Sequence, residues 1–205
     1  MVAEPLTPER RRQQTRDALV AAATRVFAER GFHGASLDEV AAVAGFTKGA
    51  VYSNFSGKDE LFLAVLEARY ERALSGLQAA VERTADRPDR PTDWADYVSG
   101  QYTEEEEHWS VLMQEFTLYA LRHPEARARL AALQRADAEA ISRVIAAERR
   151  LHGIDMPEPS EDQATIVIAL FRGLFEMRVI DHDAVDERVL ASVMSFVTRA
   201  MTPPA

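Results

Sequence analysis

The chain has 205 residues, 47% of them apolar, with nine glycines, nine prolines and no cysteine. This composition supports a buried core and excludes a disordered tract, disulfide bonds and cysteine-based zinc sites. The N-terminus has no apolar run of signal-peptide length, and the most apolar stretch, residues 164–174, is far shorter than the roughly 20 residues that span a bilayer. We therefore expect a soluble, cytoplasmic protein with no membrane partner.

The net charge of −9 is unevenly distributed. Residues 1–60 contain eight Lys or Arg and eight Asp or Glu, whereas residues 61–205 contain sixteen and twenty-five. The acidity therefore lies in the C-terminal part, and any contact with nucleic acid must use local positive charge. The residues that supply such charge are Arg10, Arg11, Arg12, Arg16, Lys48 and Lys58.

Apolar residues recur at spacings of three and four along the chain, and no alternating run indicates a strand. The first helix is expected to begin at Thr7-Pro8, with threonine as N-cap and proline in the first turn. It is expected to end near Arg30, before Gly31. Two short helices then extend to about Phe55.

Ser56, with Asp59 three residues later, is expected to cap a long helix that ends near Arg83. Residues 85–91, with two prolines, predict a linker. The remaining helices are expected over about 92–107, 108–122, 124–151, 161–180, with Ser160 as cap, and 185–201. The sequence thus predicts an all-α fold of nine helices.

A helix-turn-helix is predicted between Leu37 and Phe55. Ser36 and Glu39 match a capping box, Ala41 is small enough for two helices to cross, and Gly45 can end the first helix in the left-handed conformation. The apolar contacts between the helices are assigned to Leu37, Val40, Ala44, Phe46 and Val51.

The second helix of this motif is expected to begin after Thr47, its cap, and to cover residues 48–54. Its side chains are small and polar, which suits an element that enters a major groove about 12 Å wide. The motif therefore indicates a protein that binds DNA.

Residues 12–70 resemble the N-terminal domain of the TetR family of transcriptional regulators. Four segments match in order: Phe27-x-x-x-Gly31-Phe32, Ser36-Leu37-x-x-Val40-Ala41-x-x-Ala44-Gly45, Lys48-Gly49-x-Val51-Tyr52-x-x-Phe55 and Lys58-x-Glu60-Leu61-Phe62. The resemblance implies a three-helix DNA-binding head, residues 1–57. It also implies a larger helical domain for ligand binding and dimerisation, residues 58–205.

The resemblance also implies which residues contact DNA. Lys48 begins the recognition helix, Gly49 allows a close approach of the backbone, and Tyr52 lies where the family commonly binds phosphate. Asn54 can pair with adenine if it faces DNA, which the sequence leaves open. The full expected set is Ser36, Thr47, Lys48, Gly49, Tyr52, Ser53, Asn54, Lys58 and, unless they form only a solvated arm, Arg10, Arg11 and Arg12.

Aromatic residues in the C-terminal part have two interpretations, ordinary core or the lining of an effector pocket. His108, Glu115, Tyr119 and Arg172 could supply polar groups to such a pocket. The expected lining is Trp94, Tyr97, Trp109, Met113, Phe116, Tyr119 and Phe171.

The last two predicted helices are apolar around most of their circumference, so each must be covered on two sides. Two such helices from each of two chains would form a four-helix bundle, the usual dimer contact in the TetR family. A two-fold dimer also fits a palindromic DNA site. The expected interface residues are Ile168, Phe171, Phe175, Val189, Val193 and Phe196.

These observations predict a homodimeric repressor that a small-molecule effector releases from a palindromic operator. An activator, or a regulator that responds to a partner protein, fits the same sequence. A helical enzyme is the remote alternative, because no nucleophile–base arrangement, phosphate loop or metal-ligand spacing is present. We expect no cofactor and no metal; the sequence does not identify the effector or the operator.

Overall fold

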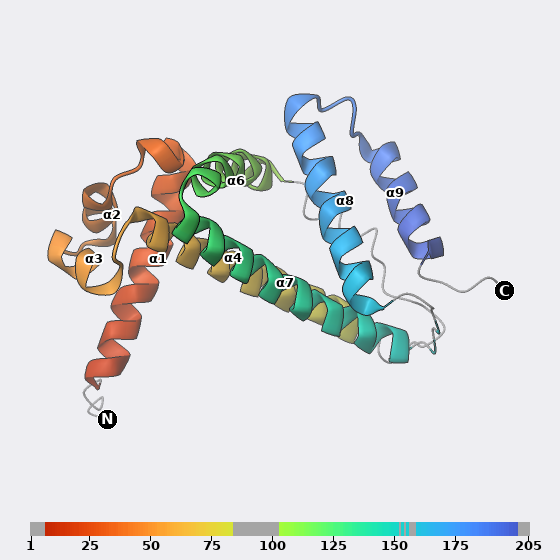
Figure 1. The fold of residues 1–205 in the computed structure, drawn as a ribbon, viewed down its shortest axis with the longest axis horizontal. Helices are drawn as coiled ribbons and strands as arrows, with labels where there is room; N and C mark the ends of the chain where they lie inside the picture. Colours follow the sequence, from red (N-terminus) through yellow and green to blue (C-terminus); the bar gives the residue numbers. More distant parts are fainter. Residues whose placement is uncertain (1–6, 84–102, 152, 154, 156–158, 201–205) are drawn as a thin grey trace. The chain divides into compact units, whose positions relative to one another are not determined.

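A computed structural model of the chain describes residues 7–83, 103–151, 153, 155 and 159–200 (Figure 1). These residues form eight α-helices and, within the described ranges, no strand, which confirms the predicted all-α fold. The helices are α1 (Pro8–Gly34), α2 (Leu37–Ala44), α3 (Lys48–Asn54), α4 (Lys58–Glu82), α6 (Glu104–Arg122), α7 (Pro124–Leu151), α8 (Ser160–Ile180) and α9 (Glu187–Ala200).

None of the described helices is long and apolar enough to cross a membrane.

One predicted helix boundary, at residues 107 and 108, is wrong. α6 continues through this point from Glu104 to Arg122, because neither glycine nor proline interrupts it. Thr103 caps its start by accepting a hydrogen bond from the N–H of Glu106 at 3.3 Å. The rest of the predicted helix over 92–107, and the linker over 85–91, lie outside the described residues.

Two predicted helix caps are also wrong. Ser56 bonds through its backbone N–H and its hydroxyl to the carboxylate of Glu60, not to Asp59. Ser160 is the first residue of α8 and accepts a hydrogen bond from the hydroxyl of Ser142 at 3.0 Å. The N-cap position of α8 is Pro159, which has no side-chain hydrogen bond.

The chain divides into two compact units. The first contains Met1–Arg69 and Leu112–Leu130, and the second contains Tyr70–Val111 and Ala131–Ala205. Helices α4, α6 and α7 each contribute residues to both units. This division follows packing, and the functional boundary after residue 57 stays a prediction.

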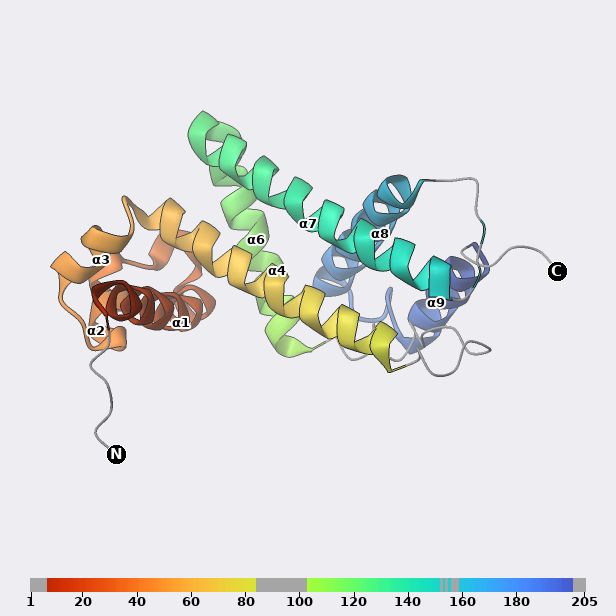
Figure 2. The ribbon, with the colours of Figure 1, turned by 90° about the horizontal axis from the view of Figure 1, so that it is seen from below.

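The first three helices pack against one another in pairs and form the N-terminal head, here residues 7–55 (Figures 1 and 2). Thr7 caps α1 by accepting from the N–H of Arg10, and Pro8 follows it, as predicted. Phe46, predicted to join the core, remains 38% exposed because it follows the turn at Gly45. The core of the head comprises Leu19, Ala22, Ala23, Val26, Phe27, Val40, Ala41, Val51 and Phe55.

An aromatic cluster joins α1, α4 and α6 within the first unit. Its members are Phe27, Phe32, Phe62 and Phe116, and each is at most 1% exposed. The ring centroids of Phe62 and Phe116 lie 4.3 Å apart, and Phe32 lies 5.0 Å from Phe116. Close aromatic pairs add to the free energy already gained by burying apolar area, so this cluster fixes the end of α1 against α4 and α6.

The path of α1 changes sharply at Gly31. Its φ of 69° and ψ of 172° belong to a region that only glycine adopts readily. The carboxylate of Glu115, on α6, accepts hydrogen bonds from the N–H groups of Phe32 at 2.8 Å and His33 at 3.4 Å. The Glu115 side chain thereby pairs backbone donors that the bend separates from α1.

Lys58, at the start of α4, satisfies the carbonyl groups on the same bend. Its ammonium donates to the carbonyl oxygens of His33 at 3.1 Å and Ala35 at 3.0 Å. It also lies 4.9 Å from the centre of the Phe32 ring. We call the bend with its two charged partners, Glu115 and Lys58, the Gly31 corner.

We predict that Gly31→Ala destabilises the protein by at least about 1–3 kcal/mol, because the backbone conformation disfavours any Cβ. A Cβ at Gly31 would also lie 2.8 Å from a carboxylate oxygen of Glu115. The matched control is Gly34→Ala, whose Cβ would meet nothing closer than 3.6 Å. Thermal unfolding of both variants checks this, and equal melting temperatures would contradict it.

Candidate nucleic-acid interface

The helix-turn-helix forms as predicted at its turn. The Ser36 hydroxyl accepts from the N–H of Glu39 at 3.1 Å and caps α2. Gly45 has φ 74° and ψ 25°, the left-handed conformation, and the N–H of Phe46 then bonds to the Ala41 carbonyl at 2.9 Å. This turn therefore fixes the orientation of α3 relative to α2.

α3 is held by one face and exposed on the other. Thr47 caps it by accepting from the N–H of Ala50 at 3.3 Å. Val51 is fully buried, whereas Tyr52 is 52% exposed. The predicted contact residues that share the exposure of Tyr52 are Thr47, Lys48, Gly49 and Ser53.

Lys48 is held by an ion pair across the motif. Its ammonium lies 2.8 Å from the carboxylate of Asp38, on α2. The hydrogen bond with Asp38, and then its charge, raises the pKa of Lys48 above the usual value. The ammonium also lies 5.9 Å from the centre of the Tyr52 ring, so these three side chains form one exposed group.

Asn54 is half-buried, and its side chain bonds to the protein. Its amide nitrogen donates to the Ala50 carbonyl at 2.8 Å, and its side-chain oxygen is buried. Arg16, on α1, donates to the Asn54 carbonyl at 3.2 Å and lies 4.4 Å from the centre of the Phe55 ring. An adenine contact by Asn54 would require its amide to leave Ala50, and this contact stays a prediction.

The two predicted residues on either side of α3, Ser36 and Lys58, both have partners within the protein. Ser36 caps α2, and the Lys58 ammonium belongs to the Gly31 corner. Partial burial lowers the pKa of Lys58, and the carboxylate of Glu115 opposes this shift. These bonds do not test whether Ser36 and Lys58 contact DNA, so both contacts stay predictions.

The arginines of the predicted arm are exposed on the first two turns of α1. Arg10, Arg11 and Arg12 all lie at the surface. Arg12 also lines a shallow depression with Glu9, Gln13, Arg16 and Asn54. Positive charge from α1 therefore reaches the C-terminal end of α3.

Sequence reasoning missed Asp38 as part of this surface. Asp38 precedes Lys48 by ten residues and lies on a different helix, so no helical spacing links the two. The exposure of Phe46 was missed for a related reason, since an apolar residue beside a turn fits either core or surface. The contact of Arg16 with Asn54 spans 38 residues and left no local pattern either.

The predicted pocket residues divide between the two units. Phe116 and Tyr119 belong to the first, where their rings lie 5.8 Å apart. Phe171 belongs to the second, where it packs with the buried residues Leu174 and Val185. Trp109 and Met113 are half-buried, and Trp94 and Tyr97 lie outside the described residues. The pocket stays a prediction.

Polar side chains from three helices meet within the second unit. Arg172, on α8, hydrogen bonds to Tyr70, on α4, and interacts with the carboxylate of Asp137, on α7. Burial raises the pKa of Asp137 to about 6, against the opposing effect of Arg172. Polar groups of this kind can orient a ligand.

The predicted dimer residues occupy different environments. Phe171, Val189 and Val193 pack between α8 and α9 of the same chain. Phe196 is 64% exposed, and Ile168 and Phe175 are half-buried. A separate face of α8 contains, at helical spacing, four exposed residues and the half-buried Gly173, beside which there is open space; the exposed residues are Ile166, Ala169, Met177 and Ile180.

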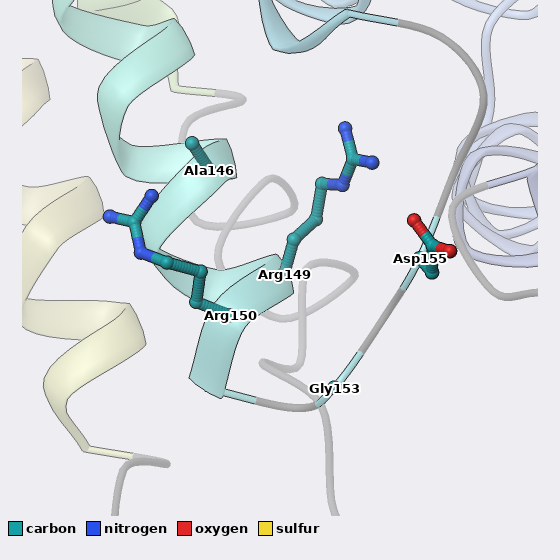
Figure 3. A pocket seen from close by; sticks show the side chains of 5 residues that line it. All are labelled: Ala146, Arg149, Arg150, Gly153 and Asp155. Atoms are coloured by element: carbon teal, nitrogen blue, oxygen red, sulfur yellow. The ribbon is translucent and has the colours of Figure 1, made fainter.

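A hollow at the end of α7 is lined by polar residues, as Figure 3 shows. Arg149 and Asp155 lie on the same side of the helix end, and Arg150 projects to the other side. Ala146 is the apolar member of this lining, so the hollow does not resemble the apolar cavities that bind drug-like molecules. Within the described ranges, no group of histidine and acidic residues could hold a metal ion.

We predict that Asp137→Asn stabilises the protein at about pH 8 and less at about pH 4. A carboxyl whose pKa is raised by folding contributes stability at pH values below 3.8, its ordinary pKa. This contribution is lost as the pH rises through about 6, its pKa in the folded protein. Asparagine removes the buried charge, and because the site is partly exposed we expect a gain of about 1 kcal/mol or less. Denaturant titrations at both pH values measure it. An equal effect of Glu139→Gln, exposed on the same helix, would contradict the explanation.

Residues 19–65 match the model of the family described as bacterial regulatory proteins, tetR family. The HTH-type transcriptional activator FasR of Mycolicibacterium smegmatis is 42% identical over 79 residues, 38% of this chain and 36% of FasR. The HTH-type transcriptional repressor BepR of Brucella suis biovar 1 is 41% identical over 68 residues, 33% of this chain and 32% of BepR. The chain thus matches about a third of the length of these curated relatives.

A solved structure extends the likeness beyond the matched domain. The crystal structure of the multidrug binding protein EbrR complexed with imidazole has a TM-score of 0.64 and 23% identity, and the match covers 93% of this chain and 96% of EbrR. At this identity the likeness concerns the fold. Together with the residues on α2 and α3, the family match confirms the resemblance predicted from sequence: the chain carries the N-terminal helix-turn-helix domain of the TetR family of bacterial regulatory proteins.

Proposed function

We propose that the protein is a transcriptional regulator that binds a palindromic DNA operator as a homodimer. The observation that carries this proposal is the two-sided character of α3. Val51 is fully buried in the head, while Lys48 and Tyr52 are exposed on a short helix with small neighbours. Such a helix can enter the major groove without moving the core beneath it.

In this proposal the side chains of Thr47 and Lys48 approach base edges or phosphate, and Gly49 allows the backbone to approach the DNA closely. The Tyr52 hydroxyl donates to a phosphate oxygen. Arg10, Arg11 and Arg12 add contacts to the backbone from α1. Residues 1–60, which include the head, have no excess of positive charge, so a single head would bind weakly. Two heads related by two-fold symmetry would bind two half-sites about one helical turn apart, roughly 34–36 Å.

The exposed face of α8 supports dimerisation. Ile166 and Met177 are 61% and 54% exposed, and Ala169 and Gly173 between them are small enough for a second helix to approach closely. An apolar face of this kind is unfavourable in water unless a partner covers it. We therefore place the interface on this face and on Phe196 of α9, beside the residues predicted from the sequence.

We infer that the regulator is a repressor and that a small molecule bound in the C-terminal domain, residues 58–205, releases it from DNA. The names of BepR and EbrR support a repressor and a ligand-binding domain of this fold, whereas the name of FasR supports the alternative, an activator. The effector must bind the DNA-free state more tightly, since a ligand with equal affinity for both states shifts nothing. Such a regulator acts in the cytoplasm and catalyses no reaction.

We predict that Lys48→Ala and Tyr52→Phe weaken operator binding without lowering the melting temperature, because both side chains are exposed. Loss of the Tyr52 hydroxyl removes a phosphate contact and should weaken binding on every sequence, whereas loss of the Lys48 ammonium should weaken binding to the operator and reduce the slope of log K against log salt concentration there by about one. Electrophoretic mobility shifts on the DNA upstream of the gene, over a range of salt, measure both effects.

The control is Arg25→Ala, an exposed charge on α1 outside the predicted contacts. If the unaltered protein forms no salt-sensitive complex on DNA near its own gene, the proposed function is wrong. A reporter fused to the bound promoter, with the gene present or deleted, then distinguishes a repressor from an activator.

We predict that Ile166→Asp converts the dimer to a monomer and weakens operator binding at least tenfold, because it buries a charge in an apolar contact. Leu121→Asp on α6 is the matched control, since Leu121 is equally exposed at 61%. Sedimentation velocity measures the oligomeric state of both. A dimer that survives Ile166→Asp but not Leu121→Asp would place the interface elsewhere.

A further inference from the structure

The ion pair between Asp38 and Lys48 lies on the surface proposed to meet DNA. The carboxylate and the ammonium are 2.8 Å apart, and the two side chains are 61% and 59% exposed. The Lys48 ammonium also lies over the Tyr52 ring. A phosphate that approaches this surface therefore meets a paired cation with a carboxylate beside it.

We infer that Asp38 is a specificity-determining residue, whose carboxylate weakens binding to DNA of unrelated sequence by holding Lys48 on the protein. This inference rests on the proposed DNA-binding function. Asp38 needs no contact with a base for this role. It acts on Lys48, and through Lys48 it changes the ratio of the affinity for operator DNA to the affinity for unrelated DNA.

The argument begins with what drives binding to unrelated DNA. Such binding comes almost entirely from cations that replace the counterions around phosphates. A lysine already neutralised by a carboxylate replaces no counterion until the ion pair opens. The carboxylate itself is repelled by phosphates. Residues 1–60 contain equal numbers of acidic and basic residues, so one paired lysine is a sizeable fraction of the positive charge available for this contact.

Operator DNA differs because it offers Lys48 a second partner of fixed geometry. An exposed ion pair is weak, so a guanine edge that accepts two hydrogen bonds can displace the carboxylate. The ion pair and the Tyr52 ring also hold the flexible lysine chain near one direction before DNA arrives, which reduces the entropy lost on binding. On the operator, the lower loss of entropy offsets the cost of opening the ion pair. On unrelated DNA, which offers no partner of fixed geometry, the cost of opening the ion pair is not offset.

A second role for Asp38 is purely structural. It lies in the first turn of α2, where a negative charge stabilises the helix through its dipole. This role alone would change the melting temperature and would leave the ratio of operator to unrelated binding as it is. The two roles are therefore separable by experiment.

The experiment titrates the full-length protein into fluorescent duplexes and measures anisotropy at several salt concentrations. One duplex has an unrelated sequence, and the other is a sequence that the unaltered protein selects from a random pool. We expect Asp38→Asn to tighten binding to the unrelated duplex about three- to tenfold, and to steepen the salt dependence by about one unit of slope. Binding to the selected duplex should change less than twofold.

Two controls use the same change of charge. Glu29→Gln, exposed on α1, should change neither duplex by more than twofold. Asp38→Glu retains the carboxylate and should behave like the unaltered protein. In a Lys48→Ala background, Asp38→Asn should have no more effect than Glu29→Gln, because its effect acts through the lysine.

Three results would overturn the inference. The first is equal tightening by Asp38→Asn and Glu29→Gln, which would indicate general charge alone. The second is an effect of Asp38→Asn that persists without Lys48. The third is a large loss on the selected duplex, which would mean that Asp38 itself contacts a base. If the unaltered protein binds neither duplex, the proposed DNA-binding function is wrong. This result differs from the three above, in which the protein binds DNA and only the role of Asp38 is wrong.

Discussion

The Gly31 corner is the constraint on which the first unit depends. A helix that bends through a glycine with positive φ leaves backbone N–H groups on one side and carbonyl groups on the other without partners. Glu115 accepts from the first set and Lys58 donates to the second, so two opposite charges satisfy one bend. Phe32, inside the bend, is 1% exposed and packs against the ring of Phe116, and the hydrogen bond from its N–H to Glu115 is partly buried.

The corner also sets where α2 begins. Lys58 binds the carbonyl of Ala35, the residue before the N-cap of α2, so the direction of α2 follows from contacts made by α4. The turn at Gly45 then fixes α3 relative to α2. Short, hydrogen-bonded connections therefore link the aromatic cluster, the Gly31 corner, α2 and α3, and they restrict the orientation of the exposed face of α3. A surface that must match the DNA groove needs this rigidity.

Features that depend on neighbours in the sequence could be predicted, and features that depend on distant contacts could not. The caps at Thr7, Ser36 and Thr47 and the left-handed Gly45 were predicted correctly, because each follows from spacings of three or four residues. Glu115 was assigned to a possible pocket, since nothing in the sequence links it to a glycine 84 positions earlier. The same limit explains why the bonds of Lys58 to the carbonyl groups of the bend were not predicted, while its contact with DNA stays a prediction.

The distribution of charge connects the head to its proposed role. Residues 1–60 have no net charge and do not hold DNA through general attraction, and two of their cations, Lys48 and Lys58, have protein partners. The cations without an assigned partner on this face are then the arginines at the start of α1. Affinity must therefore come from geometry, through two heads placed at the correct separation. An acidic C-terminal part strengthens this requirement, because it repels phosphate wherever the heads do not fit.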